Sequence, residues 1–142
     1  MQIGQLTVKN DADFYVMGVL NITPDSFSDG GSYDSIAPAL EHCEFLLAEG
    51  ADIIDIGAES TRPGHEQIST EEEIARLLPI LNTIRAAYPK IAISIDCYRA
   101  ETARLALEAG ADMINDIWGL TYDEEMADVV AEYGAAVCIM HN

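Results

Sequence analysis

The chain has 142 residues, about half of them hydrophobic, which is enough to build a sizeable buried core. Seven basic residues against 25 acidic ones give a formal net charge of −18. This charge argues against nucleic acids and anionic membranes as partners, because both require clustered Lys and Arg. No apolar run approaches the ~18 residues of a membrane helix. The first residues also lack the basic and apolar regions of a signal peptide.

Three cysteines, Cys43, Cys97 and Cys138, lie far apart in the sequence. Their odd number and wide spacing fit neither a disulfide framework nor a zinc motif. We therefore expect three free thiols, in a protein that resides in the reducing cytoplasm.

Strand patterns and helix patterns alternate along the chain. A short hairpin is expected near residues 2–8. Five apolar runs of the kind found in parallel strands covered by helices follow, at 14–20, 52–57, 91–96, 112–117 and 136–141. The glycines Gly50, Gly110 and Gly134 each follow a helical stretch and precede a strand, which predicts that they end the helices.

The helical stretches carry apolar residues at the spacing of one helix face. The three clear faces are Ile36, Ala39, Leu40, Cys43, Leu46 and Leu47; Ile74, Leu77, Leu78, Leu81 and Ile84; and Met126, Val129, Val130 and Tyr133. A further stretch at 100–109 is rich in alanine and has a weaker face. Thr70 and Glu73 match a capping box at the second helix, and Pro79 should kink that helix.

Two architectures fit this alternation. An open doubly wound sheet would show a glycine-rich first turn such as GxGxxG, and the sequence contains none. A (β/α)8 TIM barrel places polar residues at the carboxyl ends of successive strands. Asn21, Glu59, Asp96, Asn115 and His141 show that pattern. We therefore predict an α/β fold of the (β/α)8 TIM-barrel family.

A full barrel takes about 250 residues. Residues 1–142 would accordingly form a single partial domain, about the first half of a barrel, truncated after the fifth strand.

Two long polar segments follow the first two predicted strands. They are MGVLNITPDSFSDGG at residues 17–31 and DIGAESTRPG at residues 55–64. On composition alone, the first is more simply a surface turn. Arg62 in the second could bind phosphate oxygens through its planar guanidinium, or it could be a solvated loop arginine.

Strand alternation predicts that candidate binding residues share one face of the sheet. In the third strand, Ala92, Ser94 and Asp96 would face the barrel axis and the isoleucines would face the helices. The Asp96 carboxylate suits the N–H donors of a flat heterocycle, although aspartate also favours helix N-caps. In the fourth strand, Asn115 shares a face with Ile117 and offers both a donor and an acceptor; a buried, satisfied asparagine is the alternative. Asp55 points inward by the same rule.

In this order, these four segments resemble the signatures of the dihydropteroate synthase family. The resemblance covers essentially the whole chain, and its most specific part is Glu-Ser-Thr-Arg-Pro-Gly at residues 59–64. The sequence departs from the family at Cys97, where threonine is usual. The resemblance implies an enzyme of folate biosynthesis. Such an enzyme condenses 6-hydroxymethyl-7,8-dihydropterin pyrophosphate with p-aminobenzoate to give 7,8-dihydropteroate and pyrophosphate.

The resemblance also implies roles for individual residues. Asp96 and Arg62 would be catalytic, Asp96 by stabilising a pterin cation and Arg62 by holding the leaving group. The pterin would be bound by Asp96, Asn115, Ile117 and Met140, although Met140 fits an ordinary core methionine at least as well.

For the rest of the site, the resemblance implies a bound Mg²⁺ that neutralises the pyrophosphate. Asn21 would be its ligand and, with Arg62, would bind pyrophosphate. The pocket for p-aminobenzoate and sulfonamides would include Phe27, Thr61 and Pro63. Asp25 and Ser26 would belong to a loop that closes over the site.

Full-length family members are homodimers, and the state of this chain stays open. The family's last three strands carry further site residues, so we expect the isolated 142-residue chain to be inactive. Two alternatives are a methyltetrahydrofolate-type pterin-binding methyltransferase and a non-catalytic pterin-binding half-barrel. The string at 59–64 argues against the methyltransferase.

Overall fold

The computed structural model describes residues 1–11, 14–22, 36–59 and 67–140. Its elements are β1 (Gln2–Ile3), β2 (Leu6–Thr7), β3 (Met17–Asn21), α1 (Ile36–Ala48), β4 (Ile53–Gly57), α2 (Thr70–Ala87), β5 (Ala92–Asp96), α3 (Ala100–Glu108), β6 (Met113–Asp116), α4 (Met126–Glu132) and β7 (Ala136–Ile139). The expected hairpin and the five expected strands are confirmed. The first buried strand begins at Met17, later than predicted.

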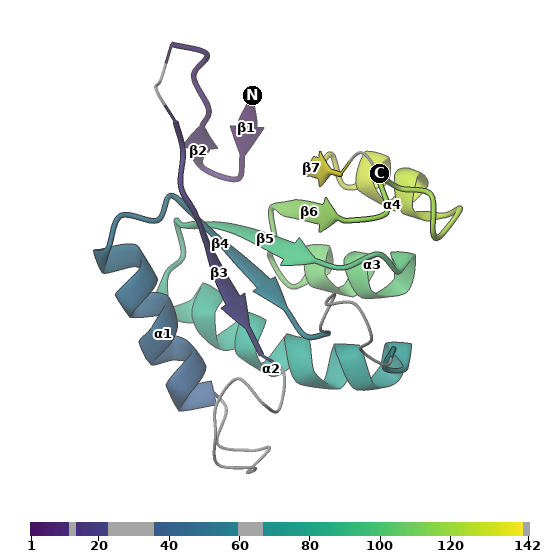
Figure 1. Cartoon of the computed structure of the whole chain (residues 1–142), viewed down its shortest axis with the longest axis horizontal. Coiled ribbons are helices and arrows are strands. Elements are labelled where there is room, and N and C mark those ends of the chain that lie inside the picture. The colour runs from purple at the N-terminus through teal and green to yellow at the C-terminus, as the bar shows by residue number, and fades with distance from the viewer. Residues whose placement is uncertain (12–13, 23–35, 60–66, 141–142) are drawn as a thin grey trace.

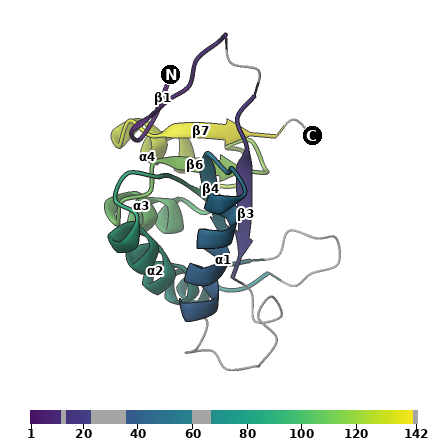
Figure 2. The same ribbon diagram turned by 90° about the vertical axis from the view of Figure 1, so that its left-hand side faces the viewer.

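Strands β3 to β7 form one parallel sheet, and their order in the sheet is their order in the chain. Figures 1 and 2 show the four helices packed along one side of this curving sheet. A doubly wound sheet reverses its strand order at a switch point. The sequential order excludes that fold and is the order of consecutive units of a (β/α)8 barrel. The predicted fold class is confirmed.

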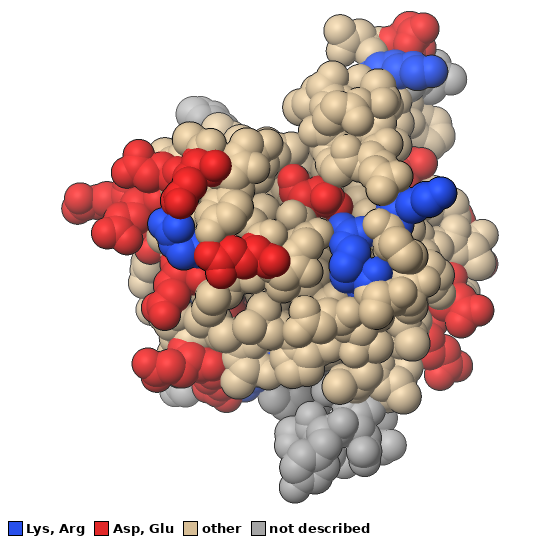
Figure 3. All heavy atoms as spheres, turned by 180° about the vertical axis from the view of Figure 1, so that it is seen from behind, with Lys and Arg blue, Asp and Glu red and all other residues tan. Residues whose placement is uncertain are grey.

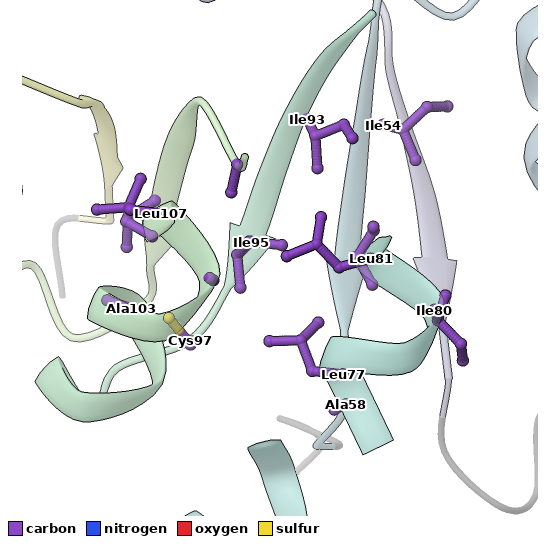
Figure 4. Packing of buried hydrophobic residues seen from close by; sticks show 14 of the residues in the cluster. Ile54, Ala58, Leu77, Ile80, Leu81, Ile93, Ile95, Cys97, Ala103 and Leu107 are labelled. Atoms are coloured by element: carbon purple, nitrogen blue, oxygen red, sulfur yellow. The ribbon is translucent and has the colours of Figure 1, made fainter. Parts of the chain in front are cut away.

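The side of the sheet that faces the helices is lined by isoleucines. Ile54 of β4 and Ile93 and Ile95 of β5 have no exposed surface. They pack against Leu77 and Leu81 of α2, as Figure 4 shows. Burying each such side chain stabilises the fold by about 1.5–3 kcal/mol. This contact fixes which face of each strand is left for the barrel axis.

The opposite, inner face is closed at its amino-terminal end by the hairpin. β1 and β2 pair antiparallel. Ile3 of β1 is buried in a small cluster with the first residues of three strands, Ile53, Ala92 and Met113. The expected hairpin therefore covers this end of the inner face, and its cluster does not reach the carboxyl ends of the strands.

The start of α2 differs from the prediction. Its N-cap is Ser69, whose hydroxyl accepts a hydrogen bond from the backbone N–H of Glu72 at 3.1 Å. Glu73 is 1% exposed and binds Arg99 instead of capping the helix. The predicted Thr70–Glu73 capping box is wrong, because Glu73 lies on the buried side of the helix.

The predicted helix stops are confirmed. Gly50, Gly110 and Gly134 have φ angles of 103°, 109° and 60°, in the left-handed region that glycine tolerates. Helix α2 continues through Pro79 to Ala87, and the kink expected at Pro79 stays a prediction.

The residues of the predicted helix faces belong to the apolar core, except for Ile74 and Tyr133. Tyr133 is exposed and its hydroxyl donates to Glu108 at 2.6 Å. All three cysteines are free; Cys43 and Cys97 are buried and Cys138 is exposed. Within the described residues, no helix is long and apolar enough to cross a membrane.

The negative charge is spread over the surface. On the face shown in Figure 3, basic side chains lie in small separate groups among more numerous acidic ones. Arg104 and Glu132 form an exposed ion pair at 2.8 Å. Such pairs contribute about 0–1 kcal/mol each, so the fold depends on its apolar packing.

We expect the 142-residue chain to associate with itself. β3 and β7 are the edges of the sheet, and Val19 on one edge and Ile139 on the other are 50% and 55% exposed. Unpaired strand edges with apolar side chains tend to pair with other chains. Sedimentation velocity should show oligomers that Ile139→Lys reduces. A monomer with a sharp melting transition would contradict this.

Candidate active site

Four residues form a row across the carboxyl ends of neighbouring strands. In the strand registers, Gly57 of β4 pairs with Asn21 of β3 on one side and with Asp96 of β5 on the other. Asp96 in turn pairs with Asn115 of β6. The structure therefore brings together three of the predicted site residues, Asn21, Asp96 and Asn115, at one end of the sheet.

Gly57 is the residue that lets this row close up. A Cβ atom at Gly57 would lie 3.3 Å from Oδ2 of Asp96 and 3.7 Å from Oδ1 of Asn21. A side chain there would occupy the space between these two groups. Glycine at this position thus lets Asn21, the residue predicted to bind pyrophosphate, lie close to Asp96, the residue predicted to bind the pterin.

Beneath the row, polar side chains are buried on the same inner face. Asp55 of β4 pairs in register with Ser94 of β5, and they are 3% and 0% exposed. The side-chain amide of Asn115 donates to Oδ2 of Asp55 at 3.2 Å. The inward orientation predicted for Asp55, Ser94 and Asn115 is therefore confirmed.

Three oxygens of this cluster have no hydrogen-bond partner within the described part of the chain. They are Oδ1 of Asp55, Oγ of Ser94 and Oδ1 of Asn115. A buried polar atom left unpaired costs about 1–3 kcal/mol. Unpaired oxygens from three adjacent strands mark a place where a ligand could supply hydrogen-bond donors.

The electrostatics of the cluster favour cations and N–H donors. The pKa of Asp96 is raised from 3.8 to about 7, and burial is the largest cause. Nearby negative charges contribute the rest of this rise, in the order Asp55, Glu73, Asp116 and Glu59. Burial also raises the pKa of Asp55, against the lowering effect of the adjacent Ser94 hydroxyl and of Asn115, which donates a hydrogen bond to it. A ligand that brings positive charge would relieve this repulsion.

Two other predicted site residues directly follow strands. Ile117 follows β6 and is half-buried. Met140 follows β7, is 52% exposed, and its role in the pocket stays a prediction. The other candidates lie outside the described residues; they are Asp25, Ser26, Phe27, Thr61, Arg62 and Pro63.

The sequence reasoning missed a buried ion-pair network centred on Arg99. The guanidinium binds Glu59 at 2.9 Å and Glu73 at 3.0 Å, and its side chain is only 11% exposed. Its carbon Cζ lies 4.7 Å from the centre of the Tyr98 ring. The signal was Glu73 itself, which lies four residues before Leu77 on the buried face of α2 and therefore needs a partner.

The same network joins two strand ends at the rim. Glu59, two residues after β4, accepts hydrogen bonds from Tyr98 Oη and from the backbone N–H of Ile68, the latter at 3.1 Å. Gln67 donates to Tyr98 Oη at 2.9 Å. Residues on both sides of 60–66 are thereby attached to the chain that directly follows Asp96.

Comparisons with known proteins agree with this geometry. A family model described as "pterin binding enzyme" matches residues 17–142. The chain belongs to this pterin-binding enzyme family. It is 51% identical over all 142 residues to the dihydropteroate synthase of Streptococcus pyogenes serotype M1, and it spans 52% of that relative. The chain thus spans about half the length of the curated relatives that it matches.

Solved structures of dihydropteroate synthases superpose well on this chain. A dihydropteroate synthase from Clostridium difficile, crystallised in the presence of pteroic acid, gives a TM-score of 0.87 at 49% identity, over 90% of this chain and 48% of that one. The Xanthomonas albilineans enzyme with 4-aminobenzoic acid gives 0.83 at 42% identity, over 89% and 46%. Their agreement confirms the partial-barrel fold.

Removing the cation of the buried network should strongly destabilise the fold. In Arg99→Ala, Glu59 and Glu73 would keep their buried positions without a positive partner. We expect a loss of about 3–5 kcal/mol in the free energy of unfolding by urea at pH 7.5. Arg104→Ala, which breaks only the exposed pair with Glu132, should cost no more than about 1 kcal/mol. Similar losses for both variants would contradict this view.

Neutralising Asp96 should stabilise the protein above neutral pH. Because its pKa is raised to about 7 in the folded chain, folding takes up a proton between about pH 4 and 7, and stability falls as the pH rises through that window. Asp96→Asn avoids this loss. Allowing for partial exposure of the carboxylate, we expect a gain of about 1–3 kcal/mol at pH 8 that vanishes at pH 4. Thermal denaturation at both pH values measures it; an equal effect at both would argue against a raised pKa.

Proposed function

We propose that this chain is the part of a dihydropteroate synthase that holds the pterin substrate. The reaction joins the methylene of 6-hydroxymethyl-7,8-dihydropterin pyrophosphate to the amine of p-aminobenzoate. The observation that carries the proposal is the row of Asn21, Gly57, Asp96 and Asn115 above buried, unpaired oxygens. The identity to dihydropteroate synthases supports it.

In this reaction the bond between the methylene carbon and the pyrophosphate oxygen breaks, and pyrophosphate leaves with the bonding electrons. The nitrogen of p-aminobenzoate then bonds to the methylene carbon and loses a proton. Positive charge develops on the pterin as pyrophosphate departs. The carboxylate of Asp96, surrounded by further negative charges, would stabilise that charge, which is the largest contribution that such a site can make.

The pterin ring would be oriented by Asp96 and Asn115. Both are held on the inner face by strand pairing, and both carry side-chain oxygens that can accept hydrogen bonds. Ile117 and Met140 are proposed as apolar contacts of the ring. Because an acidic cluster repels phosphate, the pyrophosphate needs cations, and we assign this role to Arg62 and to Mg²⁺.

The donor set at the rim fits a Mg²⁺ ion that arrives with the substrate. Among the residues described, no three His, Cys, Asp or Glu side chains are grouped to hold a metal ion. Mg²⁺ is typically bound by one or two protein oxygens, several waters and substrate phosphates. The exposed Asn21 next to Asp96 would supply one such oxygen. When bound, the ion would neutralise charge on the leaving group.

Further features of the complete enzyme belong to this proposal. Residues 1–142 would form one partial pterin-binding barrel domain, and the complete protein would be a cytoplasmic homodimer. The pocket for p-aminobenzoate and sulfonamides is assigned to Phe27, Thr61 and Pro63, with Asp25 and Ser26 in the closing loop. The methyltransferase alternative is disfavoured because the relatives compared above are dihydropteroate synthases.

We expect the 142-residue chain to bind pteroic acid without catalysing the formation of dihydropteroate. Isothermal titration should detect pteroic acid binding, and Asp96→Asn or Asn115→Ala should weaken it at least about tenfold, since each removes an acceptor of a buried hydrogen bond. The exposed variant Arg104→Ala should bind like the parent. No dihydropteroate should form at a measurable rate.

Two outcomes would contradict this proposal. Unchanged affinity in both site variants would show that pteroic acid does not bind at this row. Turnover above background by the purified chain would refute the expected inactivity.

A further inference from the structure

Asp55 and Asn115 are linked across a strand that lies between them. β4 and β6 are not neighbours, because β5 separates them in the sheet. Even so, Nδ2 of Asn115 donates to Oδ2 of Asp55 at 3.2 Å. The residue of β5 in register with Asp55 is Ser94, and its small side chain leaves room for this contact.

This hydrogen bond determines which end of the Asn115 amide is free. An ionised carboxylate only accepts hydrogen bonds, so Asn115 must turn its NH₂ group toward Asp55. Its carbonyl oxygen Oδ1 is then left buried and unpaired, as is Oδ1 of Asp55. Together with the Asp96 carboxylate, these oxygens present a row of hydrogen-bond acceptors.

We propose that Asp55 is a positioning residue for substrate recognition. By fixing the amide of Asn115 with its oxygen toward the ligand, it makes the site accept ring edges that carry N–H donors. The site would thereby prefer a 2-amino-4-oxopteridine to the otherwise similar 2,4-dioxopteridine, whose 2-oxo group would face the acceptors. This inference rests on the proposed function, because it assumes that the ligand is a pteridine.

A purely structural role fits Asp55 poorly. Its carboxylate is 3% exposed, and burial raises its pKa, so the charge destabilises the folded chain. Asparagine has nearly the same shape without that charge. If Asp55 served only folding, Asp55→Asn would be neutral or stabilising and would leave recognition unchanged.

The first test measures recognition in the 142-residue chain by titration with pterin and with lumazine, its 2-oxo counterpart. We expect Asp55→Asn to weaken pterin binding about tenfold and to narrow the preference for pterin over lumazine, because the Asn115 amide can then turn. In an Asn115→Ala background, the same change should alter affinity less than about twofold, since no amide remains to be oriented.

The matched control is Asp116→Asn. Asp116 is also fully buried, but its carboxylate accepts from the backbone N–H groups of Trp118 and Leu120 rather than from Asn115. The Asp116→Asn variant should keep the preference for pterin over lumazine. The proposal is overturned if Asp55→Asn keeps that preference too, or if its effect is undiminished in the Asn115→Ala background.

A second test needs no ligand and separates this proposal from the proposed function. The side-chain NH₂ signal of Asn115, assigned by its absence in Asn115→Ala, should exchange slowly with solvent in the parent chain. It should exchange at least about tenfold faster in Asp55→Ala. Failure of the parent to bind pterin would count against the proposed function alone. Fast exchange in the parent, or no change in Asp55→Ala, would overturn the role of Asp55.

Discussion

The site depends on which side chains of the central strands point toward the helices and which point toward the barrel axis. Apart from Ile53, β4 and β5 turn their isoleucines toward the helices and small or polar residues toward the barrel axis. Because successive residues of a strand point to opposite faces, the packing of Ile54, Ile93 and Ile95 also fixes the direction of Asp55, Ser94 and Asp96. A shift of one residue in the register of a strand would turn its carboxylates from the barrel axis toward the helices. The apolar core therefore determines the chemistry of the other face.

The inner face of the sheet contributes less to the stability of the fold than the face that packs against the helices. Asp55 and Asp96 lie in a neighbourhood of negative charge, and burial raises the pKa of both. This arrangement disfavours the free chain, but it suits a reaction in which positive charge develops on the ligand. Stability and function thus make opposite demands on the same carboxylates, as is common at active sites.

The ion-pair network around Arg99 connects the two strand ends that matter most. Glu59 follows β4, Arg99 follows β5, and Glu73 lies on α2. The contacts of Glu59 with Ile68, and of Gln67 with Tyr98, hold the chain on either side of residues 60–66 against the segment after Asp96. The buried cation Arg99 and its partners thus hold both the segment that follows Asp96 and the flanks of residues 60–66, to which we assign phosphate binding.

The sequence by itself determined the order of strands and helices, the fold class, the inward direction of Asp96 and Asn115, and the family resemblance. These follow from local periodicity, from helix-ending glycines and from strings of adjacent residues, all of which can be read along the chain. The sequence alone predicted the wrong N-cap for α2, because the burial of Glu73 depends on its ion pair with Arg99, 26 positions away.

Only the tertiary structure decided which side chains meet. The bond from Asn115 to Asp55 joins residues 60 positions apart and crosses an intervening strand. The close approach of Asn21 and Asp96 depends on the register around Gly57. Such contacts depend on sheet register and on burial, which are set by the packing of the whole sheet against its helices rather than by any local run of residues.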